Sequence, residues 1–97
     1  MATIKELSKE AKILYKKFYN KDAPNTEKAN KLLNRIENYP ITDIIYKSDG
    51  VKVLLGKFTI DYDYGEEDSI FLTKKESLGY RVGEYSINKF PAILETF

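Results

Sequence analysis

The sequence predicts an α+β fold, because three patterns follow one another along its 97 residues. Residues 1–39 carry apolar side chains at helical spacing, residues 41–86 carry them at alternate positions, and residues 87–97 end in a short helical pattern. We therefore predict a single domain made of an N-terminal antiparallel helix pair, a four-stranded antiparallel β-meander and a short C-terminal helix.

The first helix is predicted to begin after Thr3, because Thr3 and Glu6 have the spacing of a capping box. It should end near Asn20. Its apolar stripe comprises Ile4, Leu7, Ala11, Leu14, Tyr15 and Phe18. Tyr19 lies one position off this stripe, so we expect its ring to be exposed.

The second helix is predicted from Thr26 to Asn38, with Asn25 or Thr26 as its N-cap. Its stripe comprises Ala29, Leu32, Leu33 and Ile36. Proline disfavours the helical conformation of the residue before it, so Tyr39 and Pro40 should end the helix. The short connection between the two helices favours an antiparallel pair.

Alternating apolar residues predict the strands. These strands span residues 41–47, 51–64, 69–73 and 80–86. Asp49 and Gly50 are typical of a tight hairpin turn. The alternation slips at Gly56, which predicts a β-bulge inside the second strand. Residues 74–79 read as a polar loop, and Pro91 is tolerated in the first turn of the final helix.

The predicted core takes residues from every part of this fold. Its central members are Leu14, Leu33, Ile36, Val53, Ile60 and Leu72. The hydrophobic share of 42% and the 32% of charged residues are typical of a soluble globular domain. The sequence has no Cys, no N-terminal apolar run typical of a signal peptide and no apolar run of about 20 residues, so we expect a cytoplasmic protein without a membrane partner.

The absence of both His and Cys restricts the available chemistry. A Ser-His-Asp triad, a Cys–His pair and an ordinary zinc site all need one of these residues. The glycines form neither GxxxxGK[ST] nor GxGxxG. We therefore expect no enzyme activity and no cofactor, and a small metal-dependent enzyme built on carboxylates is the third hypothesis.

One candidate site is an acidic segment with two tyrosines. It comprises Asp61, Tyr62, Asp63, Tyr64, Glu66, Glu67 and Asp68. Asp61 and Asp63 should share one face of a strand, which suits a divalent metal, a solvated hairpin tip or a basic groove on a partner protein. In the last case Tyr62 and Tyr64 would anchor the contact.

A second candidate site interleaves aromatic and basic side chains. It comprises Lys16, Lys17, Tyr19, Lys21, Tyr80 and Arg81. Exposed aromatic rings beside cations can stack the bases of single-stranded nucleic acid, although tyrosine and arginine also anchor protein interfaces. The net charge is only +1, with nine basic and five acidic residues in 1–40 and seven and ten in 41–97. This weak charge disfavours nucleic acid.

We therefore predict a non-enzymatic protein that acts by binding another protein, with single-stranded nucleic acid as the alternative partner. The richness in Lys, Asn, Ile and Tyr is typical of AT-rich genomes, including those of bacteria and their phages. Small phage proteins often block host enzymes or defence systems, which makes an inhibitor our working hypothesis. A homodimer through a sheet edge or face is compatible with each of these functions.

Overall fold

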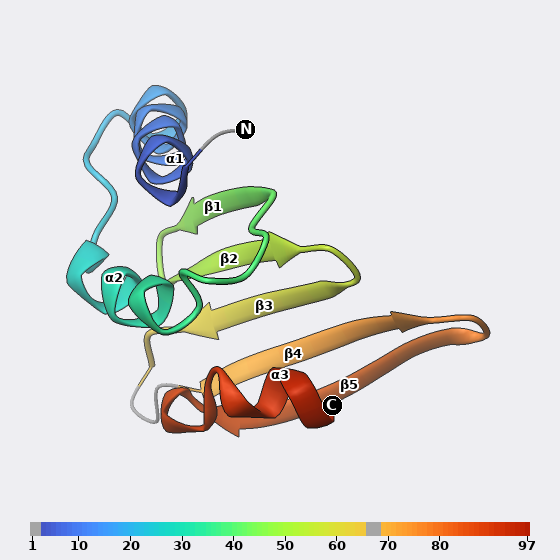
Figure 1. Ribbon diagram of the computed structural model, residues 1–97. Coiled ribbons are helices and arrows are strands. Elements are labelled where there is room, and N and C mark those ends of the chain that lie inside the picture. The colour runs from blue at the N-terminus through green and yellow to red at the C-terminus, as the bar shows by residue number, and fades with distance from the viewer. Residues whose placement is uncertain (1–2, 66–68) are drawn as a thin grey trace.

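A computed structural model describes residues 3–65 and 69–97 of the chain. It has two layers (Figure 1). One layer is a five-stranded antiparallel sheet with the order β1-β2-β3-β4-β5. The helices lie on one face of this sheet, and no described element covers the other, which we call the bare face. The α+β class and the meander are confirmed, whereas the sheet has five described strands and not four.

The first two helices begin where the sequence predicts. Helix α1 spans Ile4–Tyr19, and the Thr3 hydroxyl accepts the backbone N–H of Glu6 at 3.2 Å, as a capping box requires. Asn20 ends α1 in the left-handed conformation. Helix α2 spans Thr26–Arg35, three residues shorter than predicted, and Asn25 occupies its N-cap position without a side-chain hydrogen bond.

The two helices do not form the antiparallel pair that the short connection favours. In Figure 1 α1 is seen nearly end-on, whereas α2 runs across the view. Both ends of the connection have positive φ, 57° at Asn20 and 53° at Asn25, which redirects the chain between the helices. Helix α1 consequently lies at the edge strand β1, and α2 lies by one end of β2 and β3 (Figure 1).

Five strands replace the four predicted ones because Gly56 begins a turn. The strands are β1 (Asp43–Lys47), β2 (Gly50–Leu55), β3 (Phe58–Asp63), β4 (Ser69–Glu76) and β5 (Gly79–Ser86). Gly56 has a φ of 60°, and Leu55 pairs with Phe58 across the two-residue connection. A reversal of the chain shifts the apolar alternation as a bulge would, so the sequence pattern does not separate the two.

Two other turns differ in detail from the prediction. Residues 74–79 are not a polar loop, because β4 and β5 continue pairing up to Glu76 and Gly79. In the first hairpin Gly50 is the first residue of β2, and a side chain there would collide with the Tyr62 carbonyl of β3. Glycine is thus required at position 50 by the close approach of β3.

The C-terminal segment is tied to the last strand. It contains a 3₁₀ turn at Ile87–Lys89 and helix α3 at Ala92–Thr96, with Pro91 just before the helix. Arg81 of β5 donates from Nη1 to the Phe97 carbonyl at 2.7 Å, and its guanidinium lies 4.8 Å from the centre of the Phe97 ring. This pair of contacts holds α3 on the inner face of β5.

The core fills the space between the helices and the sheet. Buried residues that form it include Ala29, Leu32, Leu33, Ile36, Val51, Val53, Leu55, Ile60, Ile70, Leu72, Phe90 and Leu94. Five of the six predicted central residues are therefore confirmed. Leu14 is the exception, since 58% of its surface is exposed. Among the described helices, none is long and apolar enough to cross a membrane.

Candidate functional site

A group of four exposed apolar and aromatic side chains lies around the groove where α1 crosses β1. Leu14, Phe18 and Tyr19 of α1 and Ile45 of β1 are exposed around a groove of about 400 Å³. We call these four residues the α1–β1 patch. Phe18 is 85% exposed and Tyr19 is 54% exposed. Single exposed apolar residues are ordinary, but a contiguous set of them is typical of an interaction surface.

The way α1 docks explains why this set is uncovered. Ser8, Ala11 and Tyr15 form the buried strip of the helix, and the Ser8 hydroxyl lies 2.7 Å from that of Tyr46 on β1. Leu14 and Phe18 lie three residues beyond Ala11 and Tyr15, on the flank of this strip. Because α1 crosses the sheet at its edge strand, no further strand of the described chain extends beneath that flank.

Aromatic contacts orient part of the patch. The Tyr19 ring lies against the buried Tyr15 ring, with centroids 4.5 Å apart, and the Phe18 centroid is 6.3 Å from that of Tyr19. The exposed rings therefore continue an aromatic cluster that begins in the core. The predicted exposure of Tyr19 is confirmed, whereas the predicted burial of Phe18 is wrong.

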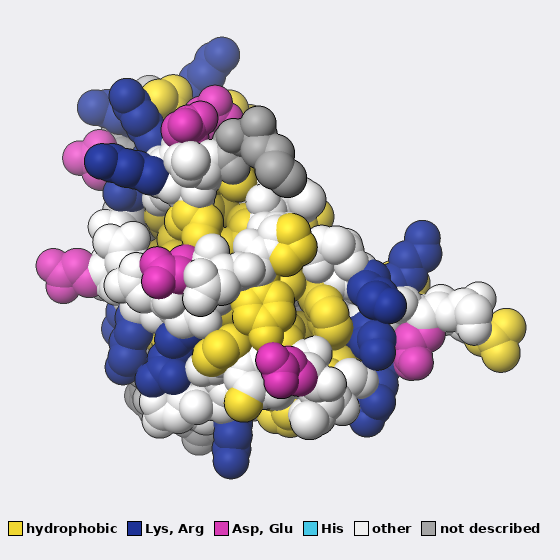
Figure 2. All heavy atoms as spheres, in the orientation of Figure 1, with side chains coloured by type: hydrophobic (Ala, Val, Ile, Leu, Met, Phe, Trp, Pro, Cys, Tyr) yellow, Lys and Arg dark blue, Asp and Glu magenta, His cyan; other side chains and the backbone are white. Residues whose placement is uncertain are grey.

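Lysines outnumber acidic residues beside the patch, although Asp43 of β1 also lines its groove. Residues 11–21 contain four lysines and no acidic residue. Lys16 has a weak ion pair with the following Asp22, at 3.8 Å between two exposed side chains. Figure 2 shows Lys and Arg side chains, interspersed with Asp and Glu side chains, around α1 at the top of the view. An apolar centre with a basic rim favours a partner that combines apolar and acidic side chains.

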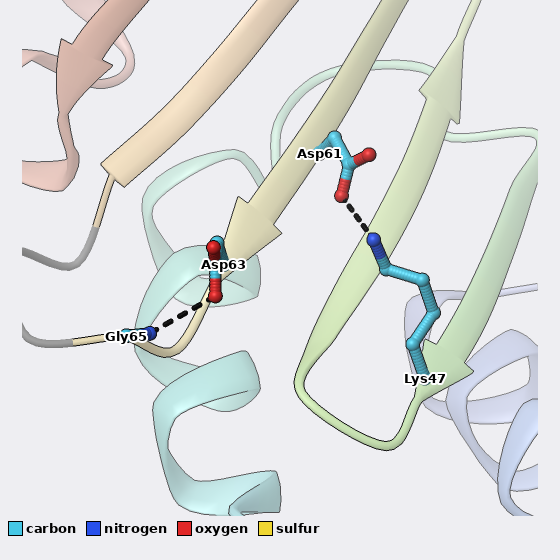
Figure 3. A network of polar contacts seen from close by, with 4 residues as sticks. All are labelled: Lys47, Asp61, Asp63 and Gly65. Atoms are coloured by element: carbon cyan, nitrogen blue, oxygen red, sulfur yellow. Dashed lines mark hydrogen bonds and ion pairs between the residues drawn. The ribbon is translucent and has the colours of Figure 1, made fainter.

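The acidic segment has a different geometry from the one predicted. Asp61 and Asp63 do share the bare face of β3, but both carboxylates already have partners (Figure 3). Asp61 Oδ1 accepts Lys47 Nζ at 2.5 Å across the sheet, and Asp63 Oδ1 accepts the Gly65 N–H at 3.0 Å. Lys47 thus offsets part of the negative charge on which a contact through this segment would depend.

Tyr62 and Tyr64 lie on the opposite face of β3, which corrects their predicted role as surface anchors. Tyr62 is 1% exposed and Tyr64 is 8% exposed, and their rings pack edge to face at 5.1 Å. The alternation of a strand places them inward whenever Asp61 and Asp63 point outward. The candidates Glu66, Glu67 and Asp68 lie outside the described residues.

The Tyr64 hydroxyl is buried and has no hydrogen-bond partner within residues 3–65 and 69–97. Burial, with smaller contributions from Tyr46 and Tyr62, raises the pKa of this hydroxyl far above its ordinary value of 10.0. The group therefore stays neutral in the folded protein at alkaline pH values where an ordinary tyrosine begins to ionise. Within the described part of the chain, no three acidic side chains come together as metal ligands.

The aromatic–basic candidates are divided between two ends of the molecule. Lys16, Lys17, Tyr19 and Lys21 lie at the C-terminal end of α1, beside the patch. Tyr80 and Arg81 lie on β5, at the far edge of the sheet from β1. The guanidinium of Arg81 is engaged with Phe97. The six residues do not form one surface.

A larger hollow, of about 750 Å³, lies between the start of α1 and residues 37–42. Its apolar lining residues Ile4, Leu7 and Tyr39 are half-buried and already pack against the core. This hollow therefore lacks the exposed anchors that the α1–β1 patch provides.

No protein-family model matches the chain, and neither a curated protein nor a solved structure shows significant similarity to it.

Proposed function

We propose that the chain is a protein-binding domain and that the α1–β1 patch is its docking surface. The observation that carries the proposal is the exposure of Leu14 and Phe18. Both belong to the apolar stripe of α1, yet no other described residue buries them. When a partner covers large apolar side chains at a groove, the complex is stabilised by about 25 cal/mol per Å² of apolar surface buried.

The chemistry of the patch defines the partner. Its centre needs bulky apolar side chains to fill the groove between α1 and Ile45, and the lysines of residues 11–21 need acidic side chains at the rim. The proposed partner is therefore a protein segment that carries apolar anchors flanked by Asp or Glu. Blocking the active site of a host enzyme is one way in which such binding would act.

Single-stranded nucleic acid is the second candidate, because Tyr19 is exposed between Lys16, Lys17 and Lys21. Two observations favour protein. Leu14 and Ile45 supply aliphatic surface, which is not a stacking platform for bases. The remaining aromatic–basic pair, Tyr80 and Arg81, lies at the other edge of the sheet.

The test compares matched variants as bait in a lysate of cells in which the protein is expressed. Leu14→Ser with Phe18→Ser removes the apolar centre of the patch, and Lys16→Glu with Lys17→Glu reverses the charge of its rim. Leu78→Ser removes a fully exposed apolar side chain at the tip of the β4–β5 hairpin and serves as the control. All three keep buried residues intact, so thermal unfolding should show that each variant folds.

We expect proteins retained by the wild-type chain and by the Leu78→Ser control to be lost from both patch variants, with or without nuclease. Added salt should weaken the retention, because the rim is charged. Retention that disappears with nuclease would favour nucleic acid. Retention that survives both patch variants would refute the patch as the docking surface.

A further inference from the structure

The free edge of β5 is long and regular. Eight consecutive residues of β5 pair with β4, from Ser86 opposite Ser69 to Gly79 opposite Glu76, without a bulge or a proline. No strand within residues 3–65 and 69–97 pairs with the other edge of β5. Such an edge presents unpaired backbone groups to any strand that can align with it.

The backbone groups on this edge can be assigned from one hydrogen bond. Lys75 of β4 donates its N–H to the Lys57 carbonyl, on the β3 side. Alternate residues of an antiparallel strand bond to opposite neighbours, so Lys74 bonds toward β5 and its partner Arg81 bonds toward β4. Tyr80, Val82 and Glu84 alternate with Arg81, so they direct their N–H and C=O groups to the free edge.

The opposite edge of the sheet is protected in ways that β5 is not. Strand β1 has only five residues, and α1 crosses it. The Asp43 side chain accepts the N–H of Ile44 at 2.9 Å, so one backbone donor of that strand is already satisfied. On β5, α3 packs against the inner face through Phe97, and no described strand pairs with the edge.

The side chains beside the open groups are complementary to a second copy of the same strand. Val82 is 64% exposed and Tyr80 is 71% exposed, both on the bare face of the sheet. In an antiparallel pairing with a two-fold axis at Val82, each Val82 meets its copy and each Tyr80 lies opposite the Glu84 of the other chain. The phenol can donate to the carboxylate, and apolar surface meets apolar surface.

Other registers, with the two-fold axis at a neighbouring residue, bring less compatible side chains opposite each other. An axis at Arg81 or at Glu84 brings two like charges directly opposite each other, which is destabilising. An axis at Gly83 places each Val82 against a Glu84 carboxylate. The axis at Val82 avoids both problems and places Arg81 opposite glycine.

We propose that two copies of the chain associate through their β5 edges, antiparallel, with Val82 on the two-fold axis, to form one continuous sheet. An edge of about seven paired residues buries less surface than the roughly 1,200–2,000 Å² of stable interfaces, so the association is reversible and depends on concentration. It uses the edge of the sheet farthest from the α1–β1 patch, and it stands whether or not that patch binds a protein.

Because the chain has no Cys, a single introduced cysteine can report the proposed contact by forming a disulfide with its copy. In the proposed register the Cα atoms of the two Val82 residues lie about 5.5 Å apart, within the span of a disulfide. The two Leu78 residues, at the tips of the β4–β5 hairpins, lie roughly 25 Å apart. Val82→Cys is therefore the reporter, and Leu78→Cys, at a fully exposed position, is the control.

Under mild oxidation we expect Val82→Cys to form covalent dimers about tenfold or more faster than Leu78→Cys, because association raises the local concentration of its thiols. Val82→Lys in the Cys-free chain should lower the average mass measured by sedimentation at high concentration. Equal cross-linking of the two cysteine variants, or a wild-type chain that stays monomeric at every concentration, would overturn the proposal.

Discussion

Leu14 and Leu72 are the same residue type in opposite surroundings, which allows a matched test of the core. Leu72 is fully buried on β4, whereas Leu14 projects from α1 at the patch. We predict that Leu72→Ala lowers the free energy of unfolding by about 2–5 kcal/mol. Leu14→Ala should change it by no more than about 0.5 kcal/mol. Urea unfolding of both variants measures the difference, and equal losses would show that Leu14 is part of the core.

Tyr64 gives a prediction for alkaline pH. Its pKa is raised in the folded protein, so above pH 10 the unfolded chain loses a proton that the folded chain keeps. Stability then falls as the pH rises above about 10, because the unfolded state binds fewer protons. Tyr64→Phe should reduce this fall in urea unfolding measured from about pH 8 to about pH 11. Tyr80→Phe, at an exposed tyrosine, should leave this fall in stability unchanged. If stability falls with pH in Tyr64→Phe as it does in the wild type, the Tyr64 hydroxyl is not its cause.

At the scale of elements, Gly56 and Gly50 illustrate two different physical reasons why a position requires glycine. Gly56 adopts a φ of 60° in an open turn, where a Cβ atom would meet no other atom within 4 Å. Gly50 has ordinary backbone but lies against the Tyr62 carbonyl of the next strand. We predict that Gly56→Ala costs about 1–2 kcal/mol of conformational strain. Gly50→Ala should cost more, because the backbone of β2 or β3 must move.

Thermal unfolding of the two glycine variants tests this order. A larger loss of stability for Gly56→Ala than for Gly50→Ala would contradict the prediction. It would mean that the conformation of the turn at Gly56 matters more to stability than the close contact between β2 and β3 at Gly50.

Most elements could be predicted from the sequence pattern, but the way they dock could not. Helix caps and the alternation of strands are local signals, so the ends of α1 and the meander followed from them. The turn at Gly56 was missed because reversal and bulge shift the alternation alike. The stripe of α1 indicates which side chains are apolar, but whether Leu14 is covered depends on the helix crossing β1 at an edge. Leu14 and Phe18 of the patch were therefore assigned to the core. Only the interleaved Lys16, Lys17 and Tyr19 indicated an exposed surface.

Strand periodicity also shows why the tyrosines of the acidic segment could not be surface anchors beside its carboxylates. Asp61 and Asp63 alternate with Tyr62 and Tyr64, so carboxylates and rings must face opposite sides of the sheet. One of the two pairs had to be buried, and the aromatic pair is the one that a core accepts.

At the scale of the whole molecule, the patch and the β5 edge lie at opposite edges of the sheet. The two contacts should therefore be independent, because sites without shared partners have additive effects. We predict that Leu14→Ser with Phe18→Ser leaves cross-linking through Val82→Cys unchanged. Oxidised Val82→Cys dimers should retain partners as the wild type does. Loss of one contact on changing the other would show that the two surfaces are coupled.

The most direct measurement of the docking surface is photocross-linking from single positions. A benzophenone amino acid placed at Phe18, in the patch, is compared with the same group at Phe71, which is 42% exposed on the bare face of the sheet. We expect a discrete protein adduct from position 18 and none from position 71, with the position-18 adduct lost when Lys16→Glu and Lys17→Glu are added. An adduct from position 71 and none from position 18 would place the docking surface on the bare face of the sheet and contradict the proposed function of the patch.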